Sequence, residues 1–193
     1  MGFKRSNGKK LPKIEAGDNM LHIVLFQPEI PQNTGNIMRT CVGIGAKLHL
    51  IKPLGFNIDD AKLRRSAVDY YDHLAFDVYE NWQAFIDKNQ GQYFFLTRYG
   101  RKAHSEIDFS DIKEEVYLVF GKESTGIDKD ILKDHLENCY RIPMNDKIRS
   151  LNLSNTVAIC AYEYMRQLNF PNLLKEEPAQ FKGADYLEKK EMV

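Results

Sequence analysis

The alternation of short apolar runs with helically spaced segments is the feature that most constrains the fold of this chain. The apolar runs have the length and residue types of buried strands, and the segments between them repeat apolar residues as a helix does. We predict strands at residues 21–26, 46–51, 76–79, 93–97, 116–120 and 139–142. We predict helices after the first strand and at residues 59–67, 80–89, 127–136 and 154–168. Such alternation predicts an α/β fold, with a mostly parallel sheet covered by helices on both faces.

The chain has 193 residues, which suits one domain with a full core. We expect this domain at residues 20–173, between a basic, disordered leader at 1–19 and a charged tail at 174–193. No run of about eighteen apolar residues occurs, so we expect no membrane segment. The three cysteines are far apart and have no metal-ligand spacing, which indicates reduced thiols, no bound metal and a cytoplasmic protein.

The net charge of the chain is zero, whereas nucleic-acid-binding domains are usually basic. Positive charge is concentrated in the leader and in the segment "KLRR" at residues 62–65. A run of this kind is most often a solvated helix face. Composition therefore argues weakly against a nucleic-acid binder. The basic clusters alone do not predict RNA binding without support from other motifs in the chain.

In open α/β sheets, ligands bind beyond the carboxyl ends of the strands, and three segments are candidates for such a site. The first, "QPEIPQNTGNIMRT", follows the first strand. Asn33 or Thr34 can cap a helix that starts near Gly35, and Asn36 and Arg39 then share one face of it. An arginine in the first turn opposes the helix dipole. Either Arg39 has a functional role, or it bonds a neighbouring loop.

A glycine pair in "GIGAKL" imitates the start of a dinucleotide-binding motif, but Gly43 and Gly45 end a helix and lead into a strand, so we reject that function. The second candidate segment is "LVFGKESTGI", where Gly121 ends a buried strand. A glycine at this position lets a ligand approach the main chain closely. Glu123 could bond a substrate or carry a proton, or it could be an acid at a helix N-terminus.

The third candidate segment is "RIPMNDKIRSLNLSN", which precedes an apolar helix. Apolar residues lie almost all round this helix, which predicts that it is buried. One of Asn152, Ser154 and Asn155 can cap it, and we expect Ser150 and Asn152 to lack local partners. Unpaired polar groups beside a buried helix cost about 1–3 kcal/mol each, so a bound ligand is expected to satisfy them.

The stretches "NTGNIMRTC", "LVFGKESTGI" and "RIPMNDKIRSLNLSNTVAICAYEYMRQL" together resemble the three signature motifs of the SPOUT superfamily of S-adenosylmethionine-dependent RNA methyltransferases, in the same order and spacing. "PLGFNIDDAKLRRSAVDYYDH" and "FLTRYGRKAHS" are similar to one branch of that family. This branch methylates the ribose 2′-hydroxyl of the wobble nucleotide, a cytidine or uridine, in the anticodon loop of tRNA. The resemblance covers residues 21–173.

The resemblance implies a C-terminal trefoil knot and a homodimer with the active site completed across the interface. It implies that S-adenosylmethionine is the methyl donor, bound mostly by main-chain groups of three loops. The donor-binding residues carried over to this chain are Leu96, Thr97, Gly121, Ile142, Met144, Ser150 and Leu151.

The resemblance also implies a set of catalytic residues: Asn36, Arg39, Glu123, Ser150 and Asn152. Related enzymes assign removal of the hydroxyl proton to the residue that matches Arg39. Because arginine is not normally deprotonated in a protein, a charged Arg39 that clamps an RNA phosphate and stabilises the developing alkoxide is the alternative. Candidates for contacts with RNA phosphates are Arg39, Lys62, Arg64 and Arg65.

Two other functions stay open at this point. One is a SPOUT enzyme that acts on another tRNA site or on rRNA. The other is a non-catalytic RNA-binding protein of the same fold.

Overall fold

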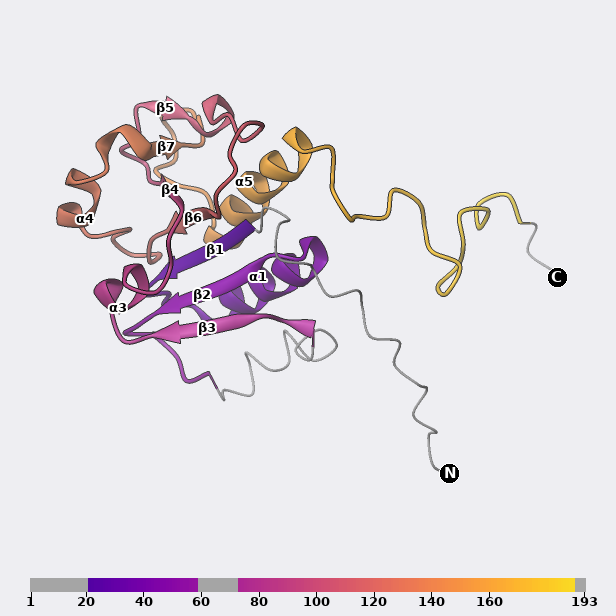
Figure 1. The fold of residues 1–193 in the computed structure, drawn as a ribbon, viewed down its shortest axis with the longest axis horizontal. Helices are drawn as coiled ribbons and strands as arrows, with labels where there is room; N and C mark the ends of the chain where they lie inside the picture. Colours follow the sequence, from indigo (N-terminus) through magenta and orange to yellow (C-terminus); the bar gives the residue numbers. More distant parts are fainter. Residues whose placement is uncertain (1–20, 59–72, 190–193) are drawn as a thin grey trace.

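The computed structural model describes residues 21–58 and 73–189 (Figure 1). The leader, the predicted helix at 59–67 and the basic residues Lys62, Arg64 and Arg65 lie outside these residues. The described chain contains one seven-stranded sheet in the order β3-β2-β1-β6-β4-β7-β5, and every neighbouring pair of strands is parallel. The predicted α/β class and parallel sheet are confirmed.

The strands agree closely with the predicted ones, apart from the short β5. They are β1 Leu21–Phe26, β2 Lys47–Ile51, β3 Phe76–Tyr79, β4 Gln92–Leu96, β5 Lys102–Ala103, β6 Val116–Phe120 and β7 Cys139–Arg141. The described helices are α1 Pro31–Ile44, α3 Trp82–Ile86, α4 Lys129–Lys133 and α5 Leu153–Gln167, with 3-10 turns η2 His104–Glu106 and η3 Leu136–Asn138. The middle helices are shorter than predicted, and β5 spans only two residues, too few for a periodic signal.

Helices cover both faces of the sheet, as Figure 1 shows, with α1 and α5 on one side and α3 and α4 on the other. The central strand β1 is buried along its whole length, and its side chains alternate between the two cores. Leu21, Ile23 and Leu25 pack in the core under α1 and α5, while Val24 and Phe26 pack in the core under α3 and α4. This two-sided burial explains why β1 reads as a continuous apolar run.

The first helix begins earlier than predicted. It starts at Pro31, which is pre-organised for a first helical position, rather than near Gly35. Its N-cap is Ile30, and neither Asn33 nor Thr34 caps it. It ends as predicted at Gly45, which has a φ of 72° and donates its N–H to carbonyl groups of the last turn.

The last helix is not buried all round. Tyr164 and Val157 are fully buried against the sheet, but Ile159 and Tyr162 are 39% and 48% exposed. The sequence pattern was misread because Ile159 and Tyr162 are apolar residues on the outer face, where polar residues are usual. The described chain after α5 contains turns but no helix or strand, and it runs away from the sheet (Figure 1).

The core under α3 contains a buried chain of hydrogen-bonded polar side chains. The Nε2 atom of His22 lies 2.7 Å from a carboxylate oxygen of Glu115, and its Nδ1 lies 2.7 Å from Nε2 of His49. The Nδ1 atom of His49 lies 3.0 Å from the Tyr79 hydroxyl. Burial lowers the pKa of His22, and it lowers the pKa of His49 to about 3, so both rings are neutral near neutral pH.

The three cysteines are free and buried, as predicted for reduced thiols. Burial raises the pKa of both Cys41 and Cys160 to about 12, which makes these thiols unreactive. No helix within the described residues has the length and apolar character that crossing a membrane requires. The trefoil threading stays a prediction from the resemblance.

Candidate active site

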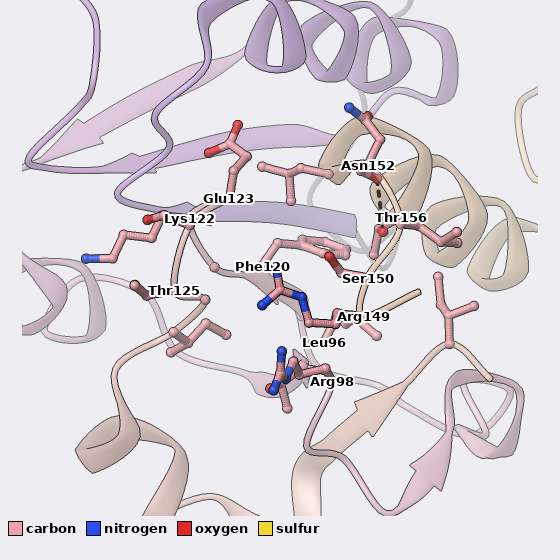
Figure 2. Close-up of a pocket in the computed structure, with 18 of the residues that line it drawn as sticks. Leu96, Arg98, Phe120, Lys122, Glu123, Thr125, Arg149, Ser150, Asn152 and Thr156 are labelled. Carbon is pink, nitrogen blue, oxygen red and sulfur yellow. Dashed lines mark hydrogen bonds between the residues drawn. The ribbon is translucent and has the colours of Figure 1, made fainter. Parts of the chain in front are cut away.

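A pocket of about 680 Å³ lies at the carboxyl ends of β4, β6 and β7, closed on one side by the start of α1 (Figure 2). All three strands point the same way, so the loops that follow them meet at one edge of the sheet. The volume is within the range of small-molecule sites, about 300–1,000 Å³. The residues that the resemblance assigns to the methyl donor all line it, namely Leu96, Thr97, Gly121, Ile142, Met144, Ser150 and Leu151.

The loop after β6 folds back tightly on itself. The Gly126 N–H donates to the Lys122 carbonyl at 2.9 Å, and Gly126 has a φ of 81°, a conformation that favours glycine. A Cβ atom on Gly121 would lie 2.2 Å from the Gly126 carbonyl carbon. Gly121 was expected to make room for a ligand. In the structure, its missing side chain makes room for the main chain of Gly126, which shapes the pocket wall.

The Glu123 carboxylate bonds the N-terminal end of α1. It accepts hydrogen bonds from the N–H of Glu29 at 2.9 Å, the N–H of Ile30 at 3.3 Å and the side-chain amide of Asn33 at 2.9 Å. In return, Glu29 accepts bonds from the main-chain N–H and the hydroxyl of Ser124. Of the two interpretations left open for Glu123, the structure favours an acid at a helix N-terminus. The helix is α1, almost a hundred residues earlier in the chain, rather than the α4 that follows.

The Asn152 side chain has several partners, so the expectation that it lacks local contacts is wrong. Its oxygen caps α5, accepting from the N–H of Ser154 at 2.9 Å and of Asn155 at 3.4 Å. Its amide group donates to the side-chain oxygen of Asn33 at 2.9 Å. In Figure 2 this side chain points toward α1 and away from the middle of the pocket. Asn152 therefore shapes the pocket by holding the two helices together.

Asn33 is the residue that sequence reasoning underestimated. It was considered only as a helix cap, but it is buried, and its side chain joins Asn152 on one side to Glu123 on the other. The result is a continuous chain of hydrogen bonds that fixes α1, the loop after β6 and the loop before α5 relative to one another. A polar residue on the buried side of a helix is the signal that could have identified it.

Ser150 agrees with its prediction. It lines the pocket, is exposed, and forms no hydrogen bond within the described part of the chain. Its hydroxyl is therefore available to a ligand in the pocket.

Asn36 and Arg39 lie together on the exposed face of α1, as predicted, but neither lines the pocket of its own chain. Arg39 is about two turns past the start of the helix. The argument that it opposes the dipole of the first turn is therefore wrong, because the helix begins at Pro31.

The composition of the pocket fits a nucleoside-containing methyl donor. Apolar side chains of Leu96, Ile142 and Leu151 provide walls for a flat base, and the surrounding main chain provides polar groups that fix its orientation. No group of three potential metal ligands occurs among the residues that the structure describes.

Known proteins resemble this chain over most of its length. The model of the SpoU rRNA Methylase family matches residues 20–162. A Listeria monocytogenes protein, named as a candidate tRNA (cytidine(34)-2′-O)-methyltransferase, is 53% identical over 156 residues, which cover 80% of this chain and 92% of the relative. A Yersinia pestis tRNA (cytidine(34)-2′-O)-methyltransferase is 45% identical over 166 residues, covering 82% of this chain and 100% of the relative.

A solved structure has the same fold. It is described as giving insights into the 2-OH methylation of C/U34 on tRNA, and it superposes with a TM-score of 0.73 at 40% identity, covering 78% of this chain and 97% of the other. The motif order, the parallel sheet, the pocket beyond its strands and these relatives agree, and this chain belongs to the SpoU methylase family.

Proposed function

We propose that this protein transfers a methyl group from S-adenosylmethionine to the ribose 2′-hydroxyl of the wobble nucleotide, position 34, of tRNA. The observation that carries the proposal is the single pocket into which three separate loops bring all the residues expected to bind the donor. The names of the relatives, which specify cytidine 34 or C/U34 of tRNA, support this substrate.

The reaction is an in-line displacement, in which the bond from the methyl group to the donor sulfur breaks as the bond to the 2′-oxygen forms. The neutral thioether leaves, and the hydroxyl proton passes to solvent water. The donor supplies an electrophilic methyl group on a sulfonium cation. The contribution of the protein is to align the hydroxyl with that methyl group, which can account for about 7–11 kcal/mol of the barrier. In the proposed site, Ser150 and the main chain around Gly121 and Leu151 hold the reactants in place.

Glu123 and Asn152 act as positioning residues in this proposal. Their side chains are engaged with α1, so they influence the reaction through the position of the pocket walls. This differs from a direct role in proton transfer, which the sequence left open for Glu123.

We propose that a second copy of the chain completes the site and that the working form is a homodimer. Arg39 projects from the exposed face of α1 outside its own pocket, and the outer face of α5 exposes Ile159 and Tyr162 nearby. A symmetric dimer through α1 and α5 would bury these apolar side chains and bring Arg39 to the partner's pocket. Its charged guanidinium would then clamp an RNA phosphate and stabilise the developing alkoxide.

The remaining parts of the proposal concern RNA contacts and location. Lys62, Arg64 and Arg65 supply further phosphate contacts to the anticodon loop, and the protein works in the cytoplasm. The sequence carries these assignments: a basic cluster for RNA contacts, and reduced, unpaired cysteines for the cytoplasm.

The test is a methyl-transfer assay with labelled S-adenosylmethionine on unmodified bulk tRNA and, in parallel, on unmodified rRNA, followed by mapping of the labelled nucleotide. We expect label in a 2′-O-methylated nucleotide at position 34. Label at another tRNA position or in rRNA would favour the related enzyme class. An absence of label, with RNA binding retained, would favour the non-catalytic RNA-binding protein.

A further inference from the structure

The lining of the pocket contains more cationic than acidic side chains. Its cationic lining residues are Arg98, Lys122, Arg141 and Arg149, and its one acidic lining residue is Glu123. The Glu123 carboxylate is already engaged by the N-terminal end of α1, and Figure 2 shows it directed away from the arginines. The positive charge of this pocket is therefore not neutralised by its own acidic side chain.

Two of the arginines face the open space of the pocket from different loops. Arg98 comes from the loop after β4, and Arg149 comes from the loop before α5; both side chains are exposed, and in Figure 2 both guanidinium groups project into the pocket. Neither forms an ion pair within the described residues. Two like charges directed into one space repel each other unless an anion lies between them.

An exposed tyrosine lies beside Arg98 and lines the same pocket as Arg149. Tyr99 is 67% exposed and lines the same pocket mouth, and the Arg98 guanidinium carbon is 4.8 Å from the centre of its ring. One face of the ring thus carries a cation, and the ring still has a large area open to solvent. Phosphate-binding cations next to an exposed aromatic ring are typical of sites for unpaired nucleotides.

The loop that carries Arg98 and Tyr99 is firmly held. The Thr97 N–H donates to the Tyr140 carbonyl at 2.9 Å, and the Gly100 N–H donates to the Thr97 carbonyl at 3.1 Å. A Cβ atom on Gly100 would lie 2.4 Å from the Tyr140 carbonyl carbon, so the turn packs directly on the main chain of β7. The main chain of the turn is therefore held in place, so binding through its two central side chains does not require the loop itself to become ordered.

We propose that Arg98, Tyr99 and Arg149 form a subsite for the nucleotide adjacent to the methylated one. The phosphate lies between the two guanidinium groups, and the base stacks on Tyr99. This inference rests on the proposed function, because it assumes an RNA substrate at the same pocket. It adds that these three side chains contact a neighbouring unpaired nucleotide of the loop.

The test measures two dissociation constants for each variant. One is the dissociation constant of unmethylated tRNA, which is measured at several salt concentrations. The demethylated donor is present at a saturating concentration, so that the donor pocket is filled and no methyl transfer occurs. The other is that of the donor alone, determined by calorimetry. We expect R98A and R149A each to weaken tRNA binding about 5- to 100-fold, to lower the salt slope by about 1, and to leave donor binding unchanged.

Tyr99 has its own pair of variants. Y99L is expected to weaken tRNA binding about 10-fold, while Y99F keeps the stacking face and binds like wild type. Matched controls are R101A, an exposed arginine of the same segment outside the pocket, and Y186L, an exposed tyrosine with Lys182 4.2 Å from its ring centre but far along the tail. Both controls are expected to bind tRNA and donor like wild type.

Three outcomes would overturn the subsite. Loss of donor affinity in R98A or R149A, with tRNA affinity retained, would mean that the arginines hold the carboxylate of the donor. An equal effect of R101A would mean a diffuse electrostatic attraction, and wild-type tRNA affinity in all variants would mean no contact. The wild-type protein is assayed for methylation in parallel, so that the subsite and the proposed function are tested separately. If the wild-type enzyme is active and all variants bind tRNA like wild type, only the subsite is refuted. A wild-type protein that binds no tRNA refutes both.

Discussion

The side-chain amide of Asn152 donates a hydrogen bond to the side-chain oxygen of Asn33 at 2.9 Å and so connects two residues that are 119 positions apart in the chain. The bond continues through Asn33 to Glu123, and each amide group along the way is used as both donor and acceptor. The pocket walls are therefore held by a polar network rather than by apolar packing alone.

This network gives the first prediction. The substitution Asn33→Ala leaves the Asn152 amide without a partner and removes the shorter of the two hydrogen bonds to one Glu123 oxygen. In a partly buried place this costs about 1–3 kcal/mol in the free energy of unfolding. We also expect weaker donor binding, because the loops on both sides of the pocket lose their connection. Urea denaturation and calorimetry measure the two effects. Asn36→Ala is the control on the same helix, and it is exposed, so its stability is expected to equal that of wild type; equal losses in both variants would contradict the assignment.

Substitution of two glycines by alanine gives the second prediction, and the expected changes in stability have opposite signs. In Gly121→Ala the new methyl group meets main-chain atoms at 2.2 Å, so we expect a loss of about 1–3 kcal/mol in stability and a loss of donor affinity. In Gly43→Ala no atom lies within 4 Å of the new methyl group, and the site is inside α1, so we expect a gain of about 0.5–1 kcal/mol. Thermal denaturation measures the change in stability of both variants. Destabilisation of Gly43→Ala would refute the helical placement of Gly43.

The buried histidines give the third prediction, which concerns pH. Burial lowers the pKa of His49 to about 3 in the folded protein, while an unfolded histidine has its ordinary pKa near 6.5. Below about pH 6.5 the unfolded chain therefore binds a proton that the folded chain does not, and stability falls as pH decreases. The slope approaches about 1.4 kcal/mol per pH unit for this residue, and the loss levels off below the folded pKa.

The measurement is urea denaturation between pH 5 and 6.5, where unperturbed carboxylates stay ionised. His49→Gln is expected to flatten the pH dependence, and His73→Gln, at an exposed position, is expected to leave it unchanged. An unaltered slope in the His49 variant would show that other groups cause the acid sensitivity.

The proposed dimer gives the fourth prediction. Arg39→Ala removes the guanidinium, and Ile142→Trp fills the pocket, so each variant alone is expected to be inactive in methyl transfer. If Arg39 serves the pocket of its partner, random mixing of the two variants restores about a quarter of the wild-type activity, because half of the dimers are mixed and each has one complete site. If Arg39 serves its own pocket, the mixture stays inactive. Size-exclusion chromatography of each variant checks that dimers form.

The sequence predicted the strands well because buried parallel strands are short, continuous apolar runs such as Leu21–Phe26. Motif resemblance predicted that residues from three separate loops come together, and these residues do line one pocket. It failed where a residue's role depends on partners that are distant in the chain. Glu123 and Asn33 are bonded to each other across 90 positions, and no local pattern contains that information.

The exposed face of α5 illustrates a different difficulty. Apolar periodicity reports which residues avoid water in the working assembly, but it does not distinguish a core from a surface covered by another chain. The all-round apolar pattern of α5 is consistent both with a dimer interface and with a monomer core. In the structure Val157 is buried, whereas Ile159 and Tyr162 lie on the outer side of the helix. Likewise, the error in placing Arg39 arose from a helix start that was set four residues too late, at Gly35 instead of Pro31.

The distribution of the pocket wall along the chain has a consequence for biogenesis. Its first residues belong to the start of α1, and its last belong to α5, so the cavity is incomplete until nearly the whole domain has emerged from the ribosome and docked. A nascent or truncated polypeptide that lacks α5 therefore lacks part of the pocket wall. A ligand that needs the complete pocket stabilises only molecules whose last helix is in place, because it binds the folded form alone.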